Sequence, residues 1–159
     1  MGTTSTTLSI QIGAPVDRVF AFLADPVKAV RAFPMGRKVA ISDIVTSPDG
    51  GLTSYRETMP MRLGPMHWDV SDTVVVEEYV PNQRIADRSS GGPVHVMSVE
   101  ASGSGTRLTF TGTVSSQIPL LDKVKVLVFT RGRGQARNME MVLAEVKKLV
   151  EAEAVEAGG

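Results

Sequence analysis

Residues that could bind a metal or an apolar ligand gather in one short stretch, MPMRLGPMHWD, from Met59 to Asp69. It holds three methionines, one of the chain's two histidines and its single tryptophan. Soft metals such as copper(I) accept thioether and imidazole ligands. The same methionines could instead line an adaptable apolar pocket, because unbranched thioether side chains fit variable shapes, or they could fill an ordinary core. The choice depends on which side chains share one face of the strands.

The stretch lies in a predicted β-hairpin with strands at residues 52–61 and 66–79. Side chains alternate between the two faces of a strand, so Met66, Trp68 and Val70 form the apolar set and His67 belongs to the other face. Because opposite residues of an antiparallel pair share a face, the methionines point away from His67, and we expect no metal site. With RLGP as the loop, the expected cross-strand pairs are Met61–Met66, Met59–Trp68, Glu57–Val70 and Tyr55–Asp72.

A second predicted hairpin joins strands at residues 93–101 and 106–114 through the loop SGSG. Leu108, Phe110 and Gly112 form its apolar set, so these positions are expected to face the interior. The pairs that follow are Val99–Leu108, Met97–Phe110 and His95–Gly112. His95 therefore points inward beside a position without a side chain, which predicts free volume next to the imidazole. In the strand at residues 83–88, an inward Ile85 places Asp87 inward as well.

These inward polar groups could do acid–base chemistry. His95 together with Asp72, Tyr55 or Glu57 could abstract a proton beside a carbonyl or assist the loss of water. The alternative for His95 is a core histidine that is hydrogen-bonded to the backbone. Asp72 and Asp87 could lie near strand ends and reach water, since burying them unpaired would cost several kcal/mol or force protonation.

Composition excludes several classes of protein. The 159 residues include 42% hydrophobic and 21% charged residues, which fits one globular domain over residues 1–159. Lysine plus arginine equals aspartate plus glutamate, so the zero net charge argues against a general binder of nucleic acid or anionic membranes. The absence of cysteine excludes disulfides and thiolate chemistry. We expect a cytoplasmic protein without a transmembrane segment, metal or cofactor, as a monomer or weak homodimer.

The remaining pattern predicts how the elements follow one another. A strand at residues 7–12 precedes two short helices at 14–25 and 26–34, and six strands follow. A long helix is expected from Pro119, with a kink or an interruption at RGRGQAR, and Met139, Val142, Leu143 and Val146 form one apolar stripe. Arg131, Arg133 and Arg137 form a solvated face or guard a cavity mouth. Residues 1–7 and 156–159 are expected to fray.

One antiparallel sheet that grips one long helix would bury the apolar face of each, which predicts an α+β fold. A resemblance lies in the order and spacing of five segments: IQIGAPVDRVFAFLADP, RLGP, VVVEEYVPNQRI, GSGTRLTF and MVLAEVKKLVEAE. Through these segments the chain resembles the START-like, birch-pollen-allergen (SRPBCC) superfamily over about residues 8–155. Within it, the chain is most similar to bacterial polyketide cyclase/dehydrase-like proteins, and RLGP is also similar to subunit-G proteins associated with carbon monoxide dehydrogenase. One departure is Phe33, where many relatives carry a tryptophan. The resemblance implies a helix-grip fold, in which a seven-stranded sheet wraps around the C-terminal helix and leaves an internal hydrophobic cavity.

The resemblance implies no single reaction, so three functions remain open. The first is binding of a hydrophobic or amphipathic, lipid- or polyketide-like molecule in the cavity. The second is a cyclase/dehydrase-type enzyme that uses His95 and a carboxylate. The third is a protein-interaction or maturation factor with an exposed apolar patch. If the protein binds such a molecule, the expected ligand-binding residues are Tyr55, Met59, Trp68, Val70, Asp72, His95, Met97, Phe110, Gly112, Met139 and Val142. The methionine and tryptophan side chains among them could equally belong to an ordinary core.

Overall fold

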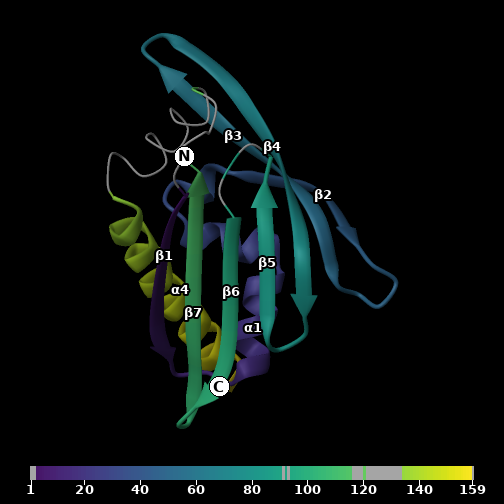
Figure 1. Cartoon of the computed structure of the whole chain (residues 1–159), viewed down its shortest axis with the longest axis vertical. Coiled ribbons are helices and arrows are strands. Elements are labelled where there is room, and N and C mark those ends of the chain that lie inside the picture. Colours follow the sequence, from purple (N-terminus) through teal and green to yellow (C-terminus); the bar gives the residue numbers. More distant parts are fainter. Residues whose placement is uncertain (1–2, 91, 93, 116–119, 121–133, 159) are drawn as a thin grey trace.

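The computed structural model describes residues 3–90, 92, 94–115, 120 and 134–158. Their strands form one antiparallel sheet in the order β1-β7-β6-β5-β4-β3-β2, with the long helix α4 against one face (Figure 1). The strands are β1 Thr3–Ile12, β2 Ala40–Thr46, β3 Leu52–Leu63, β4 Met66–Val80, β5 Arg84–Ser89, β6 Val94–Ser102 and β7 Gly105–Ser115. The helices are α1 Val16–Ala24, α2 Pro26–Ala29, the 3-10 turns η1 Val30–Ala32 and η2 Gly36–Lys38, and α4 Gln135–Gly158. The predicted helix-grip α+β fold is confirmed.

The two short helices follow from local sequence signals. Asp25 ends α1 and caps α2, because its Oδ1 accepts hydrogen bonds from the backbone N–H of Val27 at 3.0 Å and of Lys28 at 3.3 Å. Pro26 occupies the first position of α2, where a missing N–H costs nothing. The dipeptide Asp25-Pro26 therefore sets the bend between the two helices.

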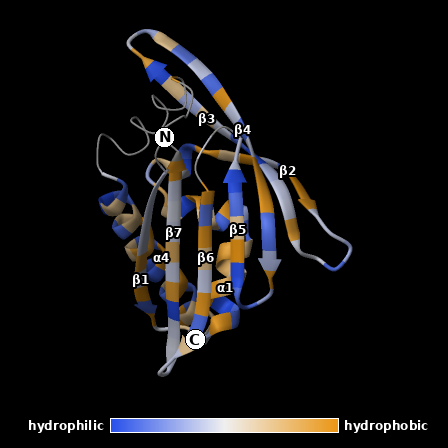
Figure 2. Ribbon diagram, viewed as in Figure 1, coloured by the Kyte–Doolittle hydropathy of each residue, from blue (hydrophilic) through white to orange (hydrophobic). Residues whose placement is uncertain are grey.

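The C-terminal helix closes the apolar core, as predicted. Val142 and Val146 on α4 are 0% and 1% exposed, and they belong to one cluster with Ile12, Leu108 and Phe110 of the sheet. Full burial of such a side chain contributes about 1.5–3 kcal/mol. Met139 and Leu143 of the predicted stripe are buried in the same cluster. Figure 2 shows hydrophobic residues alternating with hydrophilic ones along the strands that carry this core.

The predicted register is correct in one hairpin and wrong in the other. In β6–β7, His95 pairs with Gly112 and Met97 with Phe110, as expected. In β3–β4, the turn is only Gly64-Pro65, so the pairing is shifted by two residues from the expected one. Gly64 has a φ of +58°, which permits a turn this tight at no steric cost. Because side chains repeat every two residues along a strand, the shift leaves the predicted faces unchanged. The observed pairs are Leu63–Met66, Met61–Trp68, Met59–Val70, Glu57–Asp72 and Tyr55–Val74.

The end of the β3–β4 hairpin projects beyond its neighbours in the sheet (Figure 1). β2 pairs with β3 only as far as Thr58, and β5 pairs with β4 only as far as Val74. Residues 59–73 therefore form a two-stranded ribbon, and we use that name for them. Met59 and Met61 of the ribbon are buried, but Met66 and Trp68 are 59% and 43% exposed. Met66 and Trp68 share a face with these two methionines but lie nearer the ribbon's end.

The ends of the chain are more regular than expected. β1 begins at Thr3, which pairs with Ser115, so residues 3–7 lie in the sheet although we expected them to fray. α4 likewise continues to Gly158. The predictions for residues 119–133 lie outside the described residues, apart from Leu120, whose side chain is exposed. Arg131 and Arg133 belong to that undescribed part, whereas Arg137 is an exposed residue of α4.

Candidate ligand-binding site

Polar side chains collect on one half of the sheet's inner face. They come from four neighbouring strands, and we call them the inner polar cluster: Tyr55 and Glu57 on β3, Asp72 on β4, Asp87 on β5 and His95 on β6. The sheet register forms two pairs, Glu57 with Asp72 and Asp87 with His95. Tyr55 connects the two pairs, because the charges of both Asp87 and Glu57 act on its phenol.

The most specific contact in the cluster joins His95 to Asp87. The Nδ1 atom of His95 lies 3.2 Å from Oδ1 of Asp87, and the two side chains are 24% and 21% exposed. A carboxylate that accepts a hydrogen bond from Nδ1–H fixes the imidazole tautomer and leaves Nε2 as the proton acceptor. The contact with Asp87 therefore orients His95, whose side chain stays partly accessible.

Aromatic rings surround the imidazole on its apolar side. The ring of His95 lies 5.6 Å from that of Phe110 on β7 and 6.1 Å from that of Phe33, which follows η1. The rings of Phe33 and Phe110 meet edge to face at 6.4 Å. The polar edge of His95 thus adjoins a surface on which an apolar group can pack.

Tyr55 is a neutral hydrogen-bond donor within this cluster. Burial raises the pKa of its phenol well above the ordinary value, and the negative charges of Asp87 and Glu57 raise it further. The phenol therefore keeps its proton at all physiological pH values. Tyr55 can donate to a carbonyl or hydroxyl oxygen of a ligand.

The structure separates the carboxylates that the sequence had left as equal candidates. Asp72 accepts a hydrogen bond from the Ser90 hydroxyl at the base of the ribbon. The carboxylate that contacts His95 is instead Asp87, which the sequence placed inward without naming it as the partner. The sequence placed both side chains inward, but it gave no register between these strands; the structure pairs Ile85 with Met97 and so sets Asp87 opposite His95.

The predicted free volume beside Gly112 is absent. The side-chain amide of Gln135, at the start of α4, donates from Nε2 to the carbonyl oxygen of Gly112 at 2.9 Å. A Cβ at Gly112 would lie 3.0 Å from Nε2 of Gln135 and 3.3 Å from the sulfur of Met139. The prediction is wrong because this glycine admits the first turn of α4 rather than a ligand.

The other predicted ligand-binding residues fall into two environments. Met59, Phe110, Met139 and Val142 are buried, while Met97 and Val70 are half-buried. Sequence reasoning missed Asn138, whose side-chain oxygen is buried on α4 without a hydrogen-bond partner among the described residues. An acceptor in that state can take a hydrogen bond from a ligand.

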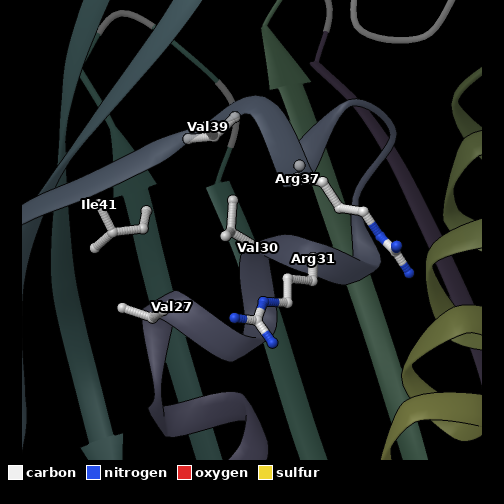
Figure 3. Close-up of a pocket in the computed structure, with 7 residues that line it drawn as sticks. Val27, Val30, Arg31, Arg37, Val39 and Ile41 are labelled. Carbon is white, nitrogen blue, oxygen red and sulfur yellow. The ribbon is translucent and has the colours of Figure 1, made fainter.

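Two hollows are formed by described residues. One, of about 170 Å³, lies between the α2–η2 segment and β2, where Val27, Val30, Val39 and Ile41 surround it (Figure 3). Because Ile41 pairs with Glu57, this hollow adjoins β3, one of the four strands that carry the inner polar cluster. A second hollow, of about 190 Å³, lies between α1 and α4 beside the ion pair of Lys28 with Glu153.

No group of three acidic or histidine side chains that could hold a metal ion occurs among the residues with described positions. Likewise, none of the described helices is long and apolar enough to cross a membrane.

Comparisons with known proteins address the family and the fold. A family model described as polyketide cyclase / dehydrase and lipid transport matches residues 3–151. No curated protein matches the chain. A crystal structure of a Nitrosomonas europaea protein has a TM-score of 0.65 at 17% identity, over 95% of this chain and 96% of that one. Ara h 8.0201 has a TM-score of 0.59 at 12% identity, over 95% and 99% of the two chains. The di-domain ARO/CYC StfQ from the steffimycin biosynthetic pathway has a TM-score of 0.60 at 14% identity; the match covers 96% of this chain and 52% of StfQ.

Proposed function

Because the chain belongs to the polyketide cyclase / dehydrase and lipid transport family, we propose that it binds a hydrophobic or amphipathic small molecule on the inner face of the sheet, where His95 adjoins the start of α4. The observation that carries this proposal is the partly exposed His95–Asp87 pair beside the rings of Phe33 and Phe110. Ligand sites combine an apolar lining with a few polar groups that fix orientation, and this arrangement has both.

The charges of the cluster restrict the polar end of the ligand. Asp87 places a carboxyl group in contact with His95 and close enough to Tyr55 for its charge to act on the phenol, and like charges repel in a partly desolvated site. A ligand carboxylate or phosphate is therefore disfavoured there. We infer a neutral oxygen, such as a ketone or hydroxyl, that accepts from Tyr55 and lies near Nε2 of His95.

The His95–Asp87 contact also favours a second candidate function, a cyclase/dehydratase-type reaction. In a dehydration, Nε2 of His95 would take a proton from the carbon beside a carbonyl, and the electron pair would form a C=C bond. The C–O bond to a β-hydroxyl would break, and the hydroxyl would leave as water with the proton that Nε2 of His95 had taken. Neutral Tyr55 would hydrogen-bond to the carbonyl oxygen, where negative charge develops.

Native mass spectrometry of the protein purified from its own host tests the binding proposal. We expect a co-purifying, mostly apolar molecule without an acidic group, and its amount should fall in Tyr55→Phe. Protein that is consistently free of small molecules, or that carries a fatty-acid-like anion, would count against the proposal as stated.

Turnover separates the two functions. The assay follows loss of water from a β-hydroxyacyl thioester of N-acetylcysteamine through absorbance of the new conjugated double bond. An enzyme should lose about a hundredfold or more of its rate in His95→Ala. A carrier should show no turnover in the parent protein while still binding ligand. His67→Ala, at the chain's other histidine, is the matched control.

A further inference from the structure

The ribbon exposes large apolar side chains at its end. Leu63, Met66 and Trp68 are 64%, 59% and 43% exposed. Leu63 pairs with Met66 and Trp68 pairs with Met61, so all three exposed side chains lie on one face of the ribbon. Gly64 and Pro65 join them in a two-residue turn. The tip is thus a narrow apolar wedge that extends beyond the rest of the sheet (Figure 1).

The residue types of this tip suit the boundary between water and lipid. Tryptophan is favoured there because its ring is apolar while its N–H can reach polar groups. Arg62 and His67 lie opposite each other on the other face of the ribbon, where their polar ends can stay in water or contact headgroups. The tip is therefore amphipathic across its two faces.

Charge is distributed unevenly around the ribbon, although the chain is neutral overall. Residues 58–68 contain no carboxylate, and neither do residues 26–42. These two segments meet in the fold, because Ala40 pairs with Thr58 and η2 ends two residues before Ala40. The nearest acidic residue on the ribbon, Asp69, lies opposite Pro60 on the face away from Trp68.

Four cations of this region have no acidic partners in the described part of the chain. Arg31, Arg37 and Lys38 lie in the η1–η2 corner, and Arg62 lies on the ribbon. Lys28 of the same region is different, because it pairs with Glu153 of α4. Unpaired cations at the base of the ribbon and at Arg62 complement the charge of an anionic surface.

We propose that the ribbon tip and the η1–η2 corner form a docking surface for a bilayer that contains anionic lipids. The apolar side chains of the tip enter the boundary between headgroups and acyl chains, while Arg37 and Lys38 contact the lipid phosphates. This inference does not depend on the proposed ligand, because docking can be measured on protein without one. It differs from the expectation that a chain of zero net charge does not bind anionic membranes. Net charge is a sum over the whole chain and does not show where cations gather locally.

The chain supplies its own probe, because Trp68 is the only tryptophan. Vesicles of phosphatidylcholine with phosphatidylglycerol, and vesicles of phosphatidylcholine alone, are titrated into the full-length protein. We expect a blue shift of Trp68 emission and co-sedimentation with the anionic vesicles. Both should weaken at high salt, because counterions screen the attraction.

Two pairs of variants test the parts of the surface. The double change Leu63→Ser and Met66→Ser should reduce binding at least tenfold, whereas Val155→Ser, at an even more exposed apolar position on α4, should not change it. The double change Arg37→Gln and Lys38→Gln should weaken binding to anionic vesicles several-fold. Lys148→Gln, at an exposed cation of α4, is the matched control.

The outcomes decide the proposal directly. Absence of binding by a folded parent protein, or binding that survives Leu63→Ser with Met66→Ser, would overturn it. So would tip-dependent self-association in sedimentation velocity without lipid binding, since the tip would then be an interface between copies. If the protein bound neutral and anionic vesicles equally, and Arg37→Gln with Lys38→Gln did not change the affinity, the η1–η2 corner would not be part of the docking surface.

Discussion

The inner face of the sheet has two halves that differ in what covers them. In the apolar half, Val142 and Val146 of α4 belong to one buried cluster with Leu108 and Ile12. The buried hydroxyl of Thr106 in this half donates a hydrogen bond to the carbonyl oxygen of Ala14. In the polar half, the neighbouring strands carry the inner polar cluster, and His95 and Asp87 remain about one-fifth to one-quarter exposed. The boundary lies at Gly112, where Gln135 begins α4.

The difference shows how one sheet can provide both stability and a site. Close-packed apolar contacts with α4 stabilise the fold. Because this stability comes from the apolar half, the adjoining strands can carry carboxylates, an imidazole and a phenol despite the cost of partly burying them. If this division is correct, substitutions in the apolar half should change stability, and substitutions in the polar half should change binding and pH dependence.

The largest effect is expected from Val142→Asp in the apolar half. Val142 is 0% exposed, so the change places an unpaired charge in the core. We expect the free energy of unfolding, measured by urea denaturation, to fall by more than about 3 kcal/mol. Ala144→Asp, on the exposed side of the same helix, is the control and should have little effect. A Val142→Asp variant as stable as the parent would contradict the placement of α4.

The next largest effect on stability is expected at Gly112, on the boundary between the two halves. Gly112→Leu must displace Gln135 and Met139, and overpacking of this kind costs about 1–3 kcal/mol. Gly112→Ala should cost much less, because the atoms nearest to its Cβ are the ends of flexible side chains. Thermal unfolding measures both variants. If Gly112→Leu proved as stable as Gly112→Ala, the space beside His95 would be empty after all.

In the polar half, Tyr55 should make stability fall at high pH. Its pKa is raised in the folded state, so above about pH 10 the unfolded chain loses the phenol proton while the native state keeps it. Stability from this group is complete below about pH 10 and falls above it, by up to about 1.4 kcal/mol per pH unit. Tyr55→Phe should flatten this loss in urea titrations, and Tyr79→Phe should retain it. Parallel alkaline curves for Tyr55→Phe and the parent would show that the phenol is solvated.

The smallest effect concerns the link between β1 and α4. Lys147 lies 2.5 Å from Glu151, which also accepts from the Gly13 N–H at 2.8 Å; both contacts lower the pKa of Glu151. A lowered folded-state pKa gives stability that is present above the unfolded value of about 4.3 and is lost as pH falls further. Glu151→Gln should slightly reduce the melting temperature at pH 7 and leave it unchanged near pH 2. An equal reduction at both values would point to packing instead of charge.

Strand periodicity predicted most of the fold and part of the site. Alternation set the faces of β3, β4, β6 and β7, and it placed His95 and Asp87 inward without any knowledge of α4. Strand periodicity could not predict where α4 begins. Gly112 was therefore interpreted as a position beside free volume, whereas its carbonyl oxygen accepts a hydrogen bond from Gln135. Periodicity also could not show that β2 and β5 stop short of the ribbon's end. Trp68 is exposed because, among the described residues, no neighbouring strand pairs with this end of the ribbon, and not because of the face on which it lies.

The polar half is tested most directly by the affinity of Nile red, a neutral apolar dye with a carbonyl oxygen. It is titrated into protein that carries Leu63→Ser and Met66→Ser, so that the exposed ribbon tip does not bind the dye. We predict saturable binding that weakens about 3- to 10-fold in Tyr55→Phe or His95→Ala, the cost of one lost hydrogen bond, and is unchanged in His67→Ala. No saturable binding, or equal affinity in all of these proteins, would contradict a ligand site at the inner polar cluster.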